Sequence, residues 1–228
     1  MSSDPPASGV RVWDLPTRLF HWVLAATIVG SIVTAKVGGN AMVWHMRLGY
    51  LVATLLVFRL VWGFVGGHWS RFASFFPTPS RLARYLRGAP RVDDHFEVGH
   101  SPLGALSVFA MLLLLGVQVA TGLVADDEIA TTGPLIAYVS GETSRLATAW
   151  HEQWGQWLII ALVVLHVAAI VFYRVRQGRN LVGPMLAGDK PLPAHVPASR
   201  DNAATRLFAA ILAAACAAAV GWVVSLGS

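Results

Sequence analysis

Four of the eight histidines lie inside or at the mouths of long apolar stretches of the sequence: His21, His45, His151 and His166. An imidazole in such a place is energetically costly, which makes it a functional candidate, and its chemistry is ligation of a metal ion or a haem iron. His151 and His166 are 15 residues apart, or about 22 Å along a helix axis at roughly 1.5 Å per residue. Their side chains then differ by only about 60° in direction, so both can face one bundle interior.

Five apolar segments are long enough to hold these histidines in a membrane, because a span needs about 20 residues to cross roughly 30 Å of hydrocarbon. The segments are residues 19–35, 43–67, 101–125, 153–173 and 207–228. Only the second contains charged residues, Arg47 near its start and Arg59 inside it. No small-x-small cleavage site follows the first, so we do not expect it to be a signal peptide. We expect an all-α integral membrane protein, a four-helix bundle with a fifth, C-terminal transmembrane helix.

The composition excludes several other classes of protein. Hydrophobic residues make up 55% of the chain and charged residues 13%, whereas a soluble domain carries about 25% charged residues. The single cysteine, Cys216, excludes a disulfide framework, a cysteine-ligated iron–sulfur cluster and covalently attached c-type haem. The net charge of +5 could suggest nucleic acid, but membrane topology explains the basic residues, so we expect no nucleic-acid partner.

Lysine and arginine are concentrated before the first span and in the loops between spans two and three and spans four and five. By the positive-inside rule, the N-terminus is cytoplasmic and the C-terminus lies on the outer side. The expected organisation is a cytoplasmic tail (1–18), a four-helix domain (19–176) with an amphipathic helix on the inner surface near 70–91, a cytoplasmic linker (177–205) and the fifth transmembrane helix (206–228). Residues 178–202 of the linker are rich in Pro and Gly, so we expect them to be irregular.

This topology sorts the four histidines into two pairs by depth, His21 with His166 near the inner face and His45 with His151 near the outer face. Two bis-histidine sites stacked across a helix bundle are the arrangement that two non-covalent b-type haems require. A single histidine at a helix mouth is more often an interfacial side chain, and a metal transporter could also use such histidines. A transporter, however, would be expected to place Asp or Glu deep within the spans, and the sequence has none there.

Arg59 follows His45 by 14 residues, which places it about 21 Å further toward the inner face. It could bind a propionate of the inner haem or extend to the lipid interface, and the sequence favours neither. Arg47 has the same two alternatives near the outer haem, with extension to the interface favoured. His100 precedes the third span, where Ser101 is expected to cap the helix. The His100 side chain could contact a haem propionate or relay a proton to a quinone, but we expect it to lie at the membrane interface. We expect the remaining three histidines to be solvated: His68, His95 and His195.

Residues 12–22, Val-Trp-Asp-Leu-Pro-Thr-Arg-Leu-Phe-His-Trp, resemble the opening of the bacterial cytochrome b561 / nickel–iron hydrogenase cytochrome b family. The resemblance continues through Gly49-Tyr50, Arg59 to Phe64, Gly99 to Gly104, Trp150-His151-Glu152 and His166, and it covers roughly residues 11–176. The combination is specific, although no single motif is. The family commonly has Asn where this chain has Ser101.

The resemblance implies two non-covalent haem b groups with the four histidines as iron ligands, and electron transfer linked to a quinone pool. We therefore expect a bacterial inner-membrane cytochrome that transfers electrons between quinone and a partner redox protein, either a hydrogenase or a cytochrome c. Such a protein is more often a subunit than a stand-alone enzyme. The alternatives are a self-contained superoxide- or cytochrome-linked quinone oxidoreductase and a non-redox membrane transporter or anchor.

Overall fold

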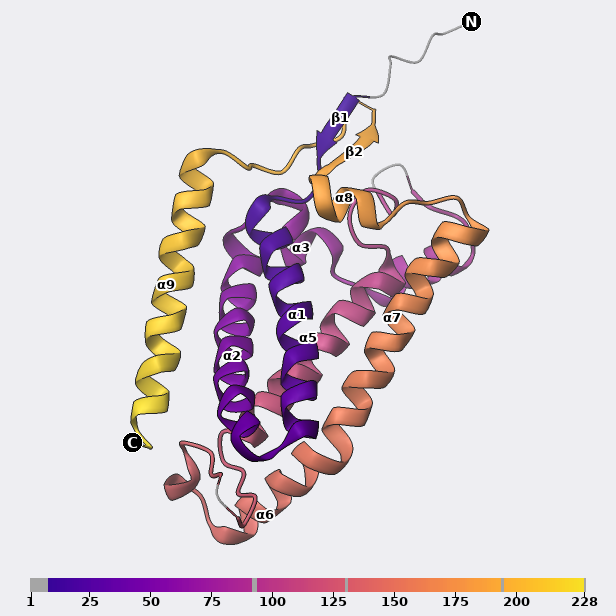
Figure 1. Cartoon of the computed structure of the whole chain (residues 1–228). Coiled ribbons are helices and arrows are strands. Elements are labelled where there is room, and N and C mark those ends of the chain that lie inside the picture. The colour runs from indigo at the N-terminus through magenta and orange to yellow at the C-terminus, as the bar shows by residue number, and fades with distance from the viewer. Residues whose placement is uncertain (1–7, 92–93, 130, 194, 228) are drawn as a thin grey trace, which may run out of the picture. The chain divides into compact units, whose positions relative to one another are not determined.

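The computed structural model describes residues 8–91, 94–129, 131–193 and 195–227 (Figure 1). In this part of the chain, five helices are long and apolar enough to cross a membrane, as predicted. They are α1 (Leu15–Val37), α2 (Met42–Val65), α5 (Pro102–Gly122), α7 (Gln156–Arg176) and α9 (Ala203–Ser225). The chain is therefore an all-α integral membrane protein, with small additional elements at the helix ends.

The additional elements are short. The helices are α3 (Phe72–Phe75), α4 (Pro79–Leu86), α6 (Gly141–Ala149) and α8 (Val182–Ala187), and the strands are β1 (Ser8–Arg11) and β2 (Asp189–Leu192). Single turns of 3-10 helix lie at η1 (Gly39–Ala41), η2 (His68–Ser70) and η3 (Ile136–Tyr138), and a π-helical segment lies at η4 (Trp150–Gly155).

Side-chain caps mark the beginnings of three spanning helices, because the first N–H groups of a helix have no partner within it. Asp14 Oδ1 accepts a hydrogen bond from Thr17 N at 2.8 Å, so α1 begins at Leu15 and not at the first residue of the apolar run. Ser101 Oγ accepts from Gly104 N at 3.2 Å, which confirms the predicted cap of α5. Asn202 Oδ1 accepts from Thr205 N at 2.9 Å at the start of α9.

The chain divides into two compact units, each described by itself. Unit 1 comprises Met1–Leu19, Leu60–Phe109 and His166–Ala209, and unit 2 comprises Phe20–Arg59, Ala110–Leu165 and Ala210–Ser228. The five spanning helices contribute residues to both units.

Four helices supply the apolar core of unit 2. Its buried members are Val52 and Leu56 of α2, Leu115 of α5 and Ile159 of α7, and residues of α1 pack against them. This is the packing expected for a four-helix bundle, and this core includes no residue of α9. Within unit 2, the turn after α9 lies against the loop after α5, since a Cβ on Gly227 would lie 2.2 Å from the carbonyl oxygen of Pro134.

Unit 1 contains a two-stranded antiparallel sheet that the sequence did not predict. Ser8 of β1 lies opposite Leu192 of β2, and Arg11 lies opposite Asp189. The Arg11 Nε–Asp189 Oδ1 ion pair, at 2.6 Å, closes one end of the sheet. Our expectation of an irregular segment over residues 178–202 was therefore wrong for residues 182–192, because this part of the Pro- and Gly-rich stretch forms α8 and then pairs with the N-terminal strand.

The amphipathic helix expected over residues 70–91 is interrupted. Phe76 precedes Pro77 and has a ψ of 124°, outside the helical region that a residue before proline avoids, so the segment splits into α3 and α4. The phenylalanines of α3 are buried and do not lie on the surface: Phe72 and Phe75 pack against Phe109 of α5, with ring centroids 5.3 and 5.8 Å away. Phe72 also lies on Gly63 of α2, where a Cβ would come within 2.1 Å of its ring.

Candidate functional site

His45 and His151 form a pair of facing imidazoles in unit 2. His45 lies in the first turn of α2 and His151 in the π-helical segment η4, and their ring centroids are 5.9 Å apart with an interplanar angle of 84°. Both residues are half-buried. Two imidazoles that bind one iron from opposite sides have centroids roughly 6 Å apart, because each metal–nitrogen bond is about 2 Å. The pair therefore has the separation that a bis-histidine haem site needs.

The hydrogen bonds of the pair select the tautomer that can bind a metal. His45 Nδ1 lies 2.9 Å from the carbonyl oxygen of Ser31, and His151 Nδ1 lies 2.9 Å from the carbonyl oxygen of Gln118. A carbonyl oxygen can only accept, so each Nδ1 carries the proton and each Nε2 keeps its lone pair. Metal-bound histidines almost always have such a partner on the second ring nitrogen, because it fixes the ring and raises its basicity.

Gln118 of α5 holds the backbone of His151 as well as its ring. Its Nε2 donates to the His151 carbonyl oxygen at 2.8 Å, and this bond lies in the π-helical segment, where the regular α-helical pattern is interrupted. Two glycines allow this close approach. A Cβ on Gly155 would lie 1.8 Å from Gln118 Oε1, and a Cβ on Gly122 would lie 2.7 Å from His151 Cε1.

The π-helical segment corrects one of our predictions. The angle of about 60° between His151 and His166 assumed a regular α-helix from one residue to the other, and His151 lies in the π-helical stretch that precedes α7. The supporting residues were also missed. Gln118 was detectable as a polar side chain within an apolar span, whereas Ser31 contributes a backbone oxygen, for which a sequence gives no signal.

The other predicted site residues are each described in their own unit. His21 of α1, in unit 2, is half-buried and its ring packs edge-on against Trp22 at 4.9 Å. Arg59 of α2, also in unit 2, is only 3% exposed. His166 of α7 belongs to unit 1 and is half-buried. His100, in unit 1, packs between Trp13 and Phe75, with centroid separations of 4.7 and 4.4 Å.

Asp14 is a further residue whose importance the sequence analysis missed. It is fully buried and, besides capping α1, accepts hydrogen bonds from Ser70 Oγ at 2.7 Å and Gly67 N at 3.0 Å. Trp62 Nε1 donates to it at 3.2 Å. A buried carboxylate is stable only with such partners, and these partners tie the start of α1, which carries His21, to the end of α2. An Asp directly before Leu-Pro is a recognisable helix-start signal.

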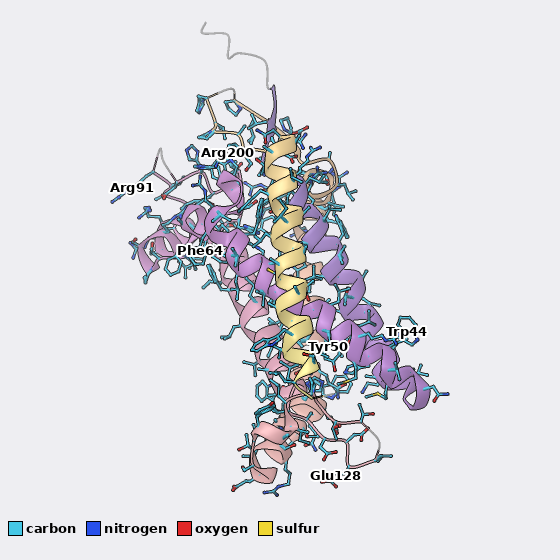
Figure 2. The ribbon with its side chains drawn as sticks, turned by 90° about the vertical axis from the view of Figure 1, so that its left-hand side faces the viewer. Trp44, Tyr50, Phe64, Arg91, Glu128 and Arg200 are labelled. Atoms are coloured by element: carbon cyan, nitrogen blue, oxygen red, sulfur yellow. The ribbon has the colours of Figure 1, made fainter. Side chains whose placement is uncertain are left out.

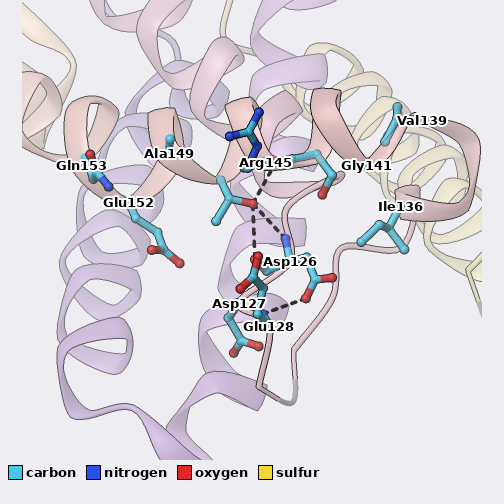
Figure 3. Close-up of a pocket in the computed structure, with 12 residues that line it drawn as sticks. Asp126, Asp127, Glu128, Ile136, Val139, Gly141, Arg145, Ala149, Glu152 and Gln153 are labelled. Atoms are coloured by element: carbon cyan, nitrogen blue, oxygen red, sulfur yellow. Dashed lines mark hydrogen bonds between the residues drawn. The ribbon is translucent and has the colours of Figure 1, made fainter.

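Acidic side chains surround a cavity of about 570 Å³ in unit 2 (Figure 3). Asp126, Asp127 and Glu128 of the loop after α5 line it together with Glu152, the neighbour of His151. Arg145 of α6 is the one basic residue among those that line it. In the described part of the chain, no group of three or more His, Cys, Asp or Glu side chains could hold a metal ion.

Two of the four basic residues of unit 2 are stacked on tryptophans. Arg47 lies over the Trp44 ring at 5.1 Å and Lys36 lies over the Trp157 ring at 5.6 Å. Arg47 is exposed. Both contacts are cation–π interactions that keep the charge at the apolar surface of a helix end.

Comparison with known proteins places these features in a family. Residues 12–188 match the family described as prokaryotic cytochrome b561, which is more than three quarters of the chain. This chain belongs to that family. As a prokaryotic cytochrome b561 it is a membrane cytochrome of the b type that functions in electron transfer, and its cofactor is haem b.

Relatives of this cytochrome carry names that refer to hydrogenases. A "Probable Ni/Fe-hydrogenase B-type cytochrome subunit" of Bradyrhizobium diazoefficiens is 23% identical, over 79% of this chain and 85% of the relative. The protein of that name from Azotobacter vinelandii is 26% identical, over 79% and 88%. A "Probable Ni/Fe-hydrogenase 1 B-type cytochrome subunit" of Escherichia coli K12 is 24% identical, over 78% and 88%. No solved structure matches this cytochrome.

Proposed function

We propose that this cytochrome binds two haem b groups and transfers electrons across the bacterial inner membrane, between a partner redox protein and the quinone pool. In this proposal His45 and His151 ligate the iron of one haem, and His21 and His166 ligate the other. The observation that carries it is the His45–His151 pair, with its 5.9 Å centroid separation and both Nδ1 atoms bonded to backbone carbonyls.

Bound haem would supply one-electron redox chemistry; the protein supplies the ligands, their orientation and the electrostatic environment. The carbonyl oxygens of Ser31 and Gln118 keep Nε2 of each ring available and make it more basic, which stabilises the oxidised iron. Arg59 is proposed to bind a haem propionate. Its burial supports this role over extension to the lipid interface, since a side chain at the interface would be exposed.

The distribution of charge supports the proposed orientation. Thirteen of the seventeen lysines and arginines belong to unit 1, whereas five of the twelve acidic residues and only four basic residues belong to unit 2. By the positive-inside rule, the basic N-terminal segment and the basic loops that follow α2 and α7 are cytoplasmic, and the C-terminus is periplasmic. The cavity that Asp126, Asp127, Glu128 and Glu152 line then lies on the periplasmic side, where it can steer a partner with a basic surface.

The names of the relatives favour a nickel–iron hydrogenase as that partner, with a cytochrome c as the second candidate. A self-contained superoxide:quinone oxidoreductase would need a positive mouth beside the His45–His151 pair, and the acidic residues of unit 2 do not provide one. A non-redox metal transporter is disfavoured because the described residues contain no cluster of three or more metal-binding side chains.

Electron transfer across vesicles tests the proposal. Haem-loaded protein in liposomes that contain trapped ferricyanide should reduce it when a quinol is added outside, and His45→Ala should slow this reaction at least tenfold. His195→Ala changes an exposed histidine of the loop before α9 and should leave the rate unchanged. Equal rates in protein-free liposomes, in the wild type and in His45→Ala would refute transmembrane transfer through this site.

A further inference from the structure

A second cavity, of about 270 Å³, lies in unit 1 between the end of α2 and the beginning of α9. Trp62 and Phe208 line it, with ring centroids 6.2 Å apart, together with Val65 and Ala204. Arg200 is the one charged residue among those that line it. Figure 2 labels Arg200 beside the first turn of the yellow α9. The lining is thus mainly apolar and includes a single cationic group.

The guanidinium of Arg200 is available for a ligand. Its neighbour Asp201 is already engaged by other arginines: Arg11 Nη1 at 2.5 Å, Arg206 Nε at 2.8 Å and, more distantly, Arg18 at 3.9 Å. Arg200 is exposed, and in the described part of the chain its side chain forms no hydrogen bond or ion pair. The cluster around Asp201 therefore retains excess positive charge, and the first N–H groups of α9 add to it.

The surroundings of the cavity indicate a lipid. It lies at the ends of two membrane-spanning helices, and two apolar side chains that line it are open: Val65 is 45% exposed and Phe208 is 49% exposed. A free phosphate ion would form one ion pair with an arginine here, but it would lose hydrating water where it contacts aromatic and aliphatic groups. A phospholipid places its phosphate at the arginine and its glycerol and acyl carbons against those same groups.

We propose that this cavity binds an anionic glycerophospholipid, with the phosphate at Arg200 and the glycerol region against Phe208 and Val65. No Asp or Glu lines the cavity, so it offers no carboxylate to the ammonium group of a zwitterionic headgroup. An anionic lipid is therefore favoured over phosphatidylcholine. The proposal depends on the membrane location of the chain and not on the haem ligands.

Native mass spectrometry of the full-length holoprotein in detergent, with added phosphatidylglycerol, tests the site. Arg200→Gln should lower phosphatidylglycerol binding about fivefold, the equivalent of roughly 1 kcal/mol for one charge near a membrane surface. Arg176→Gln is the matched control, because Arg176 is an equally exposed arginine of unit 1 that does not line the cavity. It should change binding less than twofold.

A second pair of variants tests the cavity itself. Ala204→Leu fills it and should also lower phosphatidylglycerol binding, whereas Ala203→Leu, on an exposed neighbour that does not line it, should not. Three results would overturn the proposal: equal losses in Arg200→Gln and Arg176→Gln, equal binding of phosphatidylcholine with the same acyl chains, or displacement of the lipid by millimolar inorganic phosphate. The haem absorption of each variant should match that of the wild type, which separates this site from the redox centre.

Discussion

Gly122 should control the position of the His151 ring, and Gly122→Ala tests this. The new Cβ would lie 2.7 Å from His151 Cε1, whereas non-bonded carbons normally approach to roughly 3.5 Å. The ring must then retreat by about 0.8 Å. A shift of that size is enough to weaken severely the 2.9 Å hydrogen bond from Nδ1 to the Gln118 carbonyl.

The expected consequence is weaker binding of one haem. When a metal-bound histidine loses the hydrogen-bond partner of its second ring nitrogen, the affinity for the metal typically falls about 10- to 100-fold, or roughly 1.4 to 2.7 kcal/mol. The backbone at Gly122 is not left-handed, so alanine introduces no strain of its own there. Any loss is therefore due to the displaced ring.

Haem titration of the purified apoprotein, followed by absorption spectroscopy, measures this effect. Gly116→Ala is the matched control, because Gly116 lies on the same helix and a Cβ there would meet nothing within 4 Å. It should keep both haem affinities and stabilise the helix slightly. If Gly122→Ala binds both haems as tightly as Gly116→Ala, the proposed role of the His151 ring is wrong.

Three further predictions concern the supports of the site. Gly155→Ala would place a Cβ 1.8 Å from Gln118 Oε1, so it should displace Gln118 and lower the affinity for the haem at His151 about tenfold. Gly221→Ala is the control, because a Cβ there meets nothing within 4 Å, and it should leave that affinity unchanged in the same haem titration. Asp14→Ala leaves several buried donors unpaired and should destabilise the protein by about 3 kcal/mol. Thermal unfolding should show a large drop in the melting temperature, whereas Glu142→Ala, at an exposed carboxylate, should not change it. The Arg84 guanidinium lowers the pKa of the Asp94 carboxyl, so this ion pair stabilises the loop at pH values above the ordinary carboxyl pKa and is lost as the pH falls through the lowered one. Hydrogen exchange of the Arg91 N–H, which donates to Asp94 Oδ2 at 2.9 Å, should stay slow at pH 4, and rapid exchange of that amide in the wild type would contradict this.

Much of the fold could be predicted because the spans are long and almost free of charge. The expected juxtaposition of His45 and His151 is found in the structure, since it depended only on helix lengths and on the order of the spans. The break at Pro77 could have been predicted, because that proline lies within the proposed amphipathic helix.

Other features depend on contacts between residues that are far apart in the sequence, and local sequence patterns do not reveal such contacts. The strand Asp189–Leu192 exists because it pairs with residues about 180 positions earlier. The π-helical segment at His151 is supported by Gln118, a residue of another helix. Asp14 was recognisable as a helix cap, but its bonds to Trp62, Gly67 and Ser70 required the tertiary structure.

Haem stoichiometry tests the central proposal most directly. The purified protein should contain two low-spin b-type haems per chain, measured as an oxidised-minus-dithionite-reduced spectrum with haem quantified against protein. His45→Ala and His151→Ala should each lose one haem and retain the same other one, and His21→Ala and His166→Ala should lose that other haem. One haem per chain, or losses that do not follow these pairs, would contradict the proposed ligand sets.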